Sequence, residues 1–106
     1  MKGAKIVSMK VSLTVNNIPI KLDLFVEGYV YHLTSGILAS LKDTGPINKL
    51  KLVVDNAGQV KITLNGADVP LIAFPMQIIR NTLAGMVSTL KGVDSELKTM
   101  ELKITA

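Results

Sequence analysis

Few side chains in this 106-residue sequence could carry out chemistry. His32 is the only histidine and there is no cysteine, so neither a metal site of nitrogen and sulfur ligands nor a thiol nucleophile can be assembled. The eight acidic residues are scattered among predicted turns and strand faces, and none forms a local pair suited to acid–base catalysis. Phosphate-binding glycine loops and nucleophile elbows are also absent. We therefore expect a protein that is not an enzyme and uses no cofactor.

Positive charge is the second chemical feature. The formal net charge is +4, and Arg80 is the only arginine among twelve basic residues. Five lysines are predicted to share one face of a sheet: Lys10, Lys49, Lys51, Lys61 and Lys103. Such a face could bind nucleic acid or another polyanion, or it could simply be solvated. Because arginine forks are lacking and aromatic residues make up only 4%, we expect nucleic-acid binding to be weak or absent.

Two polar pairs interrupt apolar stretches that have helical spacing. Tyr31 and His32 break the first stretch, and Arg80 and Asn81 break the second. Each pair could mark the solvent side of its helix. The alternative is a polar patch at a partner surface, and these four residues are the candidates for partner binding.

Alternating apolar residues predict the strands that must position these side chains. Residues 7–15 and 18–26 both alternate with a period of two, and Asn16–Asn17 between them is typical of a hairpin turn. Helical spacing then runs from about 29 to 42, and Gly45–Pro46 is expected to end that helix. A further strand is predicted at 49–54.

The second half of the chain predicts the same elements. Strand 60–64 follows a turn at 55–58, and Asn65–Gly66 is another hairpin signal. Residues 69–73 could pair only as an edge strand because of Pro70. A second helix is expected from about Pro75 to Gly92, and the last strand at 100–105.

A shift of 49 positions aligns the two halves and predicts an internal repeat. Asn16 then meets Asn65, Phe25 meets Phe74, and Gly36 meets Gly85. We therefore expect one domain over residues 1–106, built from pseudo-repeats 5–55 and 56–106. Neither unit could bury its helical stripe alone, so both must share one core.

These elements predict an α+β fold with a duplicated β-β-α-β unit. We expect a five- or six-stranded, largely antiparallel sheet with two helices on one face, a variant of the ferredoxin-like arrangement. Strand 7–15 should pair with 18–26, and strand 49–54 with 60–64. Gly36 and Gly85 lie at matching helix positions next to small residues, so we expect the helices to pack closely through them, either on each other or on the sheet.

The second half also resembles a known protein family. The residues that carry the similarity are Leu64-Asn65-Gly66, Val69-Pro70-Leu71, Phe74, Ile79 to Leu83 and Gly85 to Val93. They are similar to a C-terminal extension of some bacterial molybdopterin-guanine dinucleotide biosynthesis proteins of the B type. The nucleotide-binding P-loop of that family is absent here. The resemblance implies a free-standing accessory domain, without the family's GTP chemistry.

Together these observations favour a non-catalytic interaction or assembly module. The mean hydropathy of +0.40 is high for so short a chain, which favours a homodimer or docking on a larger protein. Neither a signal peptide nor a membrane span is expected, and a cytoplasmic location is predicted. The sequence alone identifies no partner.

Overall fold

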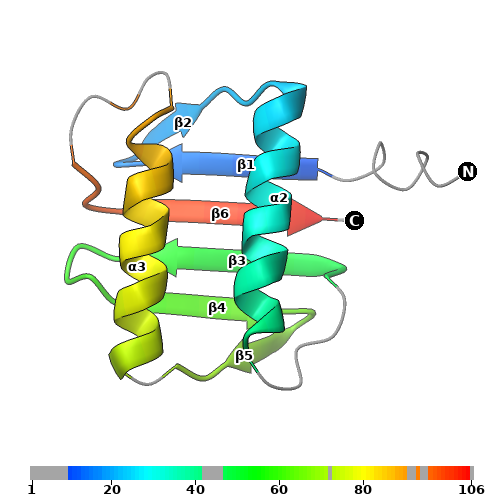
Figure 1. Ribbon diagram of the computed structural model, residues 1–106, viewed down its shortest axis with the longest axis vertical. Helices are drawn as coiled ribbons and strands as arrows, with labels where there is room; N and C mark the ends of the chain where they lie inside the picture. The colour runs from blue at the N-terminus through cyan, green and yellow to red at the C-terminus, as the bar shows by residue number, and fades with distance from the viewer. Residues whose placement is uncertain (1–9, 42–46, 72, 91–92, 94–95, 106) are drawn as a thin grey trace, which may run out of the picture.

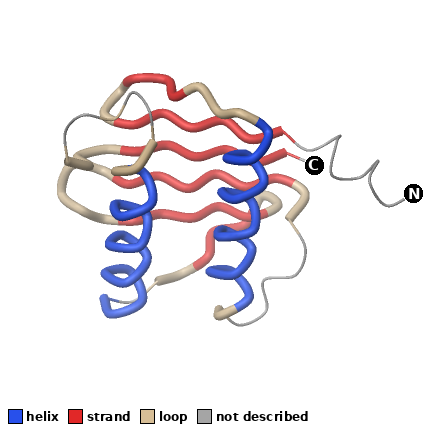
Figure 2. Tube along the Cα trace, turned by 45° about the horizontal axis from the view of Figure 1, so that its top comes forward, coloured by secondary structure: helices blue, strands red, loops and turns tan. Residues whose placement is uncertain are grey.

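The computed structural model describes residues 10–41, 47–71, 73–90, 93 and 96–105, which form two layers (Figure 1). A six-stranded antiparallel sheet makes one layer, and two helices that cover a single face of the sheet make the other (Figures 1 and 2). In chain order the elements are β1 (Lys10–Val15), β2 (Ile18–Ile20), α2 (Leu24–Ala39), β3 (Lys49–Val54), β4 (Val60–Leu64), β5 (Ala67–Val69), α3 (Ala73–Val87) and β6 (Met100–Thr105). The predicted α+β class is confirmed.

The strand order is β2-β1-β6-β3-β4-β5, with one hairpin at each edge and β6 and β3 in the centre. Both predicted pairings are confirmed, since β1 pairs with β2 and β3 with β4. The last strand of each half crosses to the other half, because β6 pairs with β1 while β3 pairs with β4. If each strand of the first predicted repeat is swapped with its counterpart in the second, the result is the same strand order read from the opposite edge of the sheet.

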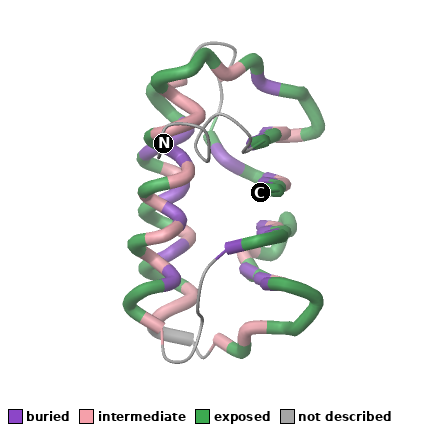
Figure 3. The backbone as a smooth tube through the Cα atoms, turned by 90° about the vertical axis from the view of Figure 1, so that its right-hand side faces the viewer, coloured by how far each residue is buried: buried purple, intermediate pink, exposed green. Residues whose placement is uncertain are grey.

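The core lies between the two layers, where the buried sides of the sheet and the helices face each other (Figure 3). Every second residue of the four inner strands is buried, as a period of two requires. Leu52 and Leu102 are directly opposite each other in the central pair, and both are fully buried. Buried residues of the helices, such as Val30 and Leu83, complete this core.

An asparagine at each edge hairpin joins the two halves. Asn16 and Asn65 adopt positive φ angles of 51° and 52°, which asparagine tolerates better than most residues. Oδ1 of Asn16 accepts hydrogen bonds from the backbone N–H groups of Lys98 and Thr99, at 2.8 and 3.0 Å. Oδ1 of Asn65 accepts from Asn48 and Lys49, both at 2.9 Å. Each hairpin thus fixes the entry to the central strand contributed by the other half.

The start of α2 differs from the sequence prediction. The strand expected over 18–26 ends at Ile20, and the helix expected from about 29 begins at Leu24. Asp23 is the reason, because its Oδ1 accepts a hydrogen bond from the Val26 N–H at 2.8 Å and so caps the first turn. Leu24 and Phe25, which alternation would place in a strand, lie on the first turn of the helix instead.

The predicted ends of both helices and the predicted bounds of the second edge strand also differ from the structure. α2 ends at Ala39, before Gly45–Pro46, which lies outside the described residues. β5 covers 67–69 rather than 69–73, so Pro70 follows the strand and Ala73 already belongs to α3. α3 ends at Val87, whereas the predicted stop at Gly92 lies outside the described residues.

The asparagine contacts give a direct test of how the halves are held together. We expect Asn16→Ala to lower the free energy of unfolding by about 1–3 kcal/mol, because two backbone donors lose their acceptor. The matched control is Asn17→Ala, since Asn17 has a positive φ of 68° in the same turn but makes none of these bonds. The measurement is chemical denaturation of both variants. Equal losses for Asn16→Ala and Asn17→Ala would assign the effect to backbone strain alone.

Candidate functional site

The outer face of the sheet gathers the five predicted lysines. β1, β3, β4 and β6 turn alternate residues away from the helices, and this places Lys10, Lys49, Lys51, Lys61 and Lys103 on one exposed surface. The phenylalanine and tyrosine side chains that the structure describes, Phe25, Tyr29 and Tyr31, all lie on α2. Among the described side chains, the lysine face, defined by the five lysines, therefore has no aromatic ring on which a base could stack.

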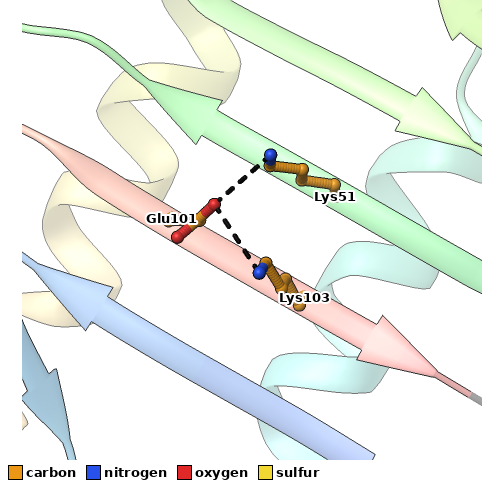
Figure 4. A network of polar contacts seen from close by, with 3 residues as sticks. All are labelled: Lys51, Glu101 and Lys103. Atoms are coloured by element: carbon orange, nitrogen blue, oxygen red, sulfur yellow. Dashed lines mark ion pairs between the residues drawn. The ribbon is translucent and has the colours of Figure 1, made fainter.

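Glu101 moderates the charge at the centre of the lysine face. Lys51 and Lys103 are directly opposite each other on β3 and β6, an arrangement that is unfavourable for like charges. The Glu101 carboxylate lies 3.5 Å from Nζ of Lys51 and 4.0 Å from Nζ of Lys103 (Figure 4). These are exposed ion pairs, so each contributes at most about 1 kcal/mol and is screened by salt.

The outer surface of the helix layer, formed by α2 and α3, has the opposite character. The two helices carry only one acidic residue, Glu27, and one arginine, Arg80, besides His32. Large apolar side chains are exposed on it instead: Leu24 at 82%, Phe25 at 77%, Tyr29 at 54% and Ile78 at 48%. The rings of Phe25 and Tyr29 stack with centroids 6.2 Å apart. The sequence analysis did not predict the aromatic patch that Phe25 and Tyr29 form, although the Asp23 cap indicates where the helix begins.

A groove runs between α2 and α3 on this outer surface. At one end it has a volume of about 450 Å³ and is lined by Phe25, Tyr29 and Leu33 from α2 and by Thr82, Gly85 and Met86 from α3, among others. A second hollow of about 330 Å³ lies between the same helices at the other end, lined by Ile37, Ser40, Leu41, Pro75, Ile78 and Ile79. We call both together the interhelical groove.

The close helix contact predicted through Gly36 and Gly85 is wrong. A Cβ atom added at either glycine would meet no atom within 4 Å outside its own helix backbone and chain neighbours, and both residues are exposed. Gly85 lines the interhelical groove instead. Helical spacing correctly places each glycine beside other small residues, but this side of each helix faces the outside.

The four polar partner-binding candidates do not form one patch. Tyr31 and His32 contact each other on α2, with ring centroids 5.2 Å apart. Tyr31 is two residues from Tyr29, and therefore points to the side of α2 opposite the groove. Arg80 is likewise two residues from the groove residue Thr82 on α3. Tyr31 and Arg80 thus lie on opposite flanks of the helix layer, whereas His32, three residues after Tyr29, shares the side of α2 that carries Tyr29.

Arg80 and Asn81 line a separate cleft of about 680 Å³ between α3 and the turn that joins β3 to β4. Its walls are Asn56, Ala57, Gly58, Gln59, Leu71, Met76, Gln77, Arg80 and Asn81. Arg80 is half-buried, and its Nη2 donates to the Leu97 carbonyl oxygen at 3.5 Å. Within the described part of the chain, this is the cleft where a charged side chain and several amides converge.

The described residues contain no candidate metal site. No group of three or more His, Cys, Asp or Glu side chains lies close enough together to hold a metal ion among them. The hydroxyl of Thr34, which is buried in α2, is already used, since it donates to the Val30 carbonyl oxygen at 2.7 Å.

Comparison with known proteins adds no assignment, since no family model, curated protein or solved structure matches the chain. Among the described residues, neither helix has both the length and the apolar character needed to cross a membrane.

The open surroundings of the helix glycines lead to a prediction about stability. Gly36→Ala and Gly85→Ala should each raise the free energy of unfolding by about 0.5–1 kcal/mol, because alanine is the better helix former and has room. Gly58→Ala is the contrasting control, since Gly58 has a φ of +83° and a Cβ there would lie 3.3 Å from Nε of Arg80. Thermal and chemical denaturation measure all three. A loss of stability in both helix variants would restore the close-contact prediction.

Proposed function

We propose that the protein is a non-catalytic assembly module that associates with a second copy of itself through the helix layer. The observation that carries the proposal is the nearly uncharged outer surface of α2 and α3, with Phe25 and Tyr29 exposed beside the interhelical groove. Aromatic residues in this setting are typical anchors of protein interfaces. Contiguous exposed apolar surface of this kind usually marks a contact with another molecule.

The edges of the sheet offer a poorer surface for association. Both edge strands, β2 and β5, are only three residues long. Pro19 sits in the middle of β2 and has no N–H to donate, and Pro70 directly follows β5. Short edge strands with proline resist pairing with another chain. Association through a continuous intermolecular sheet is therefore disfavoured.

The charge distribution is compatible with a second copy as the occupant of the helix layer. With a net charge of +4, two copies repel each other unless their lysine faces stay apart. In a dimer formed through the helix layers, each lysine face points outward, with two helix layers and two sheets between them. Layers are spaced by about 10 Å, so the separation exceeds the Debye length of about 8 Å at physiological ionic strength.

The evolutionary origin of the chain is a further part of the proposal. We propose that the two halves arose by duplication, which the reversible strand order and the matched bonds of Asn16 and Asn65 support. A role accessory to molybdenum-cofactor metabolism rests only on the resemblance of the second half to an extension in that family. A docking partner other than a second copy would use the same helix layer.

The aromatic patch can be tested without damaging the fold. Phe25→Asp removes an exposed ring and places a carboxylate in the first turn of α2, where the helix dipole favours it. We expect the dimer dissociation constant to rise at least about tenfold, as is typical for an aromatic anchor. Sedimentation velocity over a range of concentrations measures this change.

Ile18→Thr is the matched control, because Ile18 is also exposed but lies on the edge strand β2 outside the helix layer. Its dissociation constant should match that of the unmodified chain. A chain that sediments as a monomer at high micromolar concentration would overturn the proposal. So would equal weakening of the dimer by both substitutions.

A second candidate function is weak polyanion binding by the lysine face. The supporting observation is that the sheet brings five lysines from four strands onto one exposed surface. The ion pairs with Glu101 and the lack of aromatic residues on this face limit its affinity. We expect such binding to be non-specific.

Salt dependence tests this second candidate. Binding to a single-stranded oligonucleotide, followed by fluorescence anisotropy, should be weak at low salt and should fall with a log–log slope of about 0.7 per phosphate neutralised. Glu101→Gln should strengthen binding because two lysines lose their acidic partner. Lys51→Gln should weaken binding more than Lys98→Gln, which removes the same charge from an exposed residue outside the strands. Tight, salt-resistant binding would contradict this account.

A further inference from the structure

The Arg80 cleft is a feature that the proposed self-association does not use. It lies between α3 and the β3–β4 turn, on the flank of α3 that faces away from the interhelical groove. A second copy bound to the helix layer would therefore leave it accessible.

Most N–H donors of the Arg80 guanidinium stay unused by the described residues. Its Nη2 makes one long hydrogen bond, 3.5 Å, to the Leu97 carbonyl oxygen. Its Nε and Cδ lie against Gly58, where a Cβ would come within 3.3 and 3.6 Å of them. Glycine at this turn position thus allows the arginine side chain to lie against the backbone. A guanidinium has five N–H donors, so several remain for a ligand.

The walls of the cleft add polar groups without adding negative charge. Four of its lining side chains are amides: Asn56, Gln59, Gln77 and Asn81. Asp55, the acid of the adjacent turn, is engaged in the turn itself, since its Oδ1 accepts from the N–H groups of Ala57 and Gln59 at 2.9 and 3.0 Å. Arg80 is therefore the single charged residue in the lining, and its charge is positive.

We infer that this cleft binds a small oxyanion, a carboxylate or a phosphate, through Arg80. The planar fork of arginine matches both groups, and a partly desolvated guanidinium binds them more strongly than an exposed lysine does. The amides can donate to or accept from other polar groups of the ligand, while Leu71 and Met76 provide an apolar wall. The cleft volume of about 680 Å³ falls within the range typical of small-molecule sites.

Nuclear magnetic resonance offers a direct test, because the only arginine of the chain gives a single unambiguous Nε–H signal. Sodium phosphate and sodium succinate are titrated separately at constant ionic strength. We expect one of them to shift the Arg80 Nε–H signal and the amide signals of Asn56, Gln77 and Asn81 in a saturable way. The anion that saturates identifies the source of the oxyanion.

Three variants separate the site from general charge effects. Arg80→Gln should weaken binding of the saturating anion at least about tenfold. Lys61→Gln removes one charge from the lysine face and should leave the dissociation constant unchanged. Gln77→Ala leaves Arg80 in place and substitutes an exposed residue of the cleft, so it should weaken binding even if Arg80→Gln impairs folding.

Two results would overturn the inference. One is that neither anion gives a saturable shift at Arg80. The other is that Arg80→Gln and Lys61→Gln reduce anion binding equally, which would make the effect one of net charge. Neither result bears on self-association, which sedimentation of the same samples reports separately.

Discussion

The pairing of β3 with β6 is the interaction on which the rest of the structure depends. These two strands come from different halves of the chain, yet they lie side by side in the centre of the sheet, with Leu52 opposite Leu102 in the core. The β1–β2 hairpin pairs with β6, and the β4–β5 hairpin pairs with β3, so each edge hairpin pairs with the central strand contributed by the other half. Neither half could therefore form a continuous sheet alone. The long-range hydrogen bonds of Asn16 and Asn65 add further contacts between the two halves, one at each hairpin.

This crossed topology decides which surfaces are available for function. Each helix connects a hairpin at one edge with a central strand, and both helices cover the same face of the sheet (Figure 2). The opposite face is left to solvent and carries the lysines. Apolar residues on the outer side of the helices have no second layer to cover them within one chain, which is why Phe25 and Tyr29 are exposed. The two faces thus differ in charge and in the kind of partner they suit.

The sequence predicts those features of the fold that depend on local patterns of residues. Alternation identifies the inner strands, and the turn asparagines identify both hairpins. Alternation fails at 22–26 because Leu22 and Leu24 continue the pattern into a helix that Asp23 caps. Helical spacing predicts which residues share a helix face with Gly36 and Gly85, but it does not predict which face packs against another element. The Arg80 cleft joins residues 56–59 with 76–81, so only the folded chain brings its walls together.

The near symmetry of the helix layer has a consequence for the proposed dimer. The two ends of the interhelical groove correspond under the repeat shift, because Tyr29 matches Ile78 and Leu90 matches Leu41. A second copy could therefore dock in two orientations related by a half turn, bringing either like or unlike ends together. Among the described side chains the two ends differ, because Tyr29, which stacks on Phe25, is matched by Ile78, which offers no ring for stacking. The two orientations of the proposed dimer should therefore differ in energy. In the proposed dimer, the aromatic pair provides apolar area for association and a difference between the two ends that favours one arrangement over a mixture.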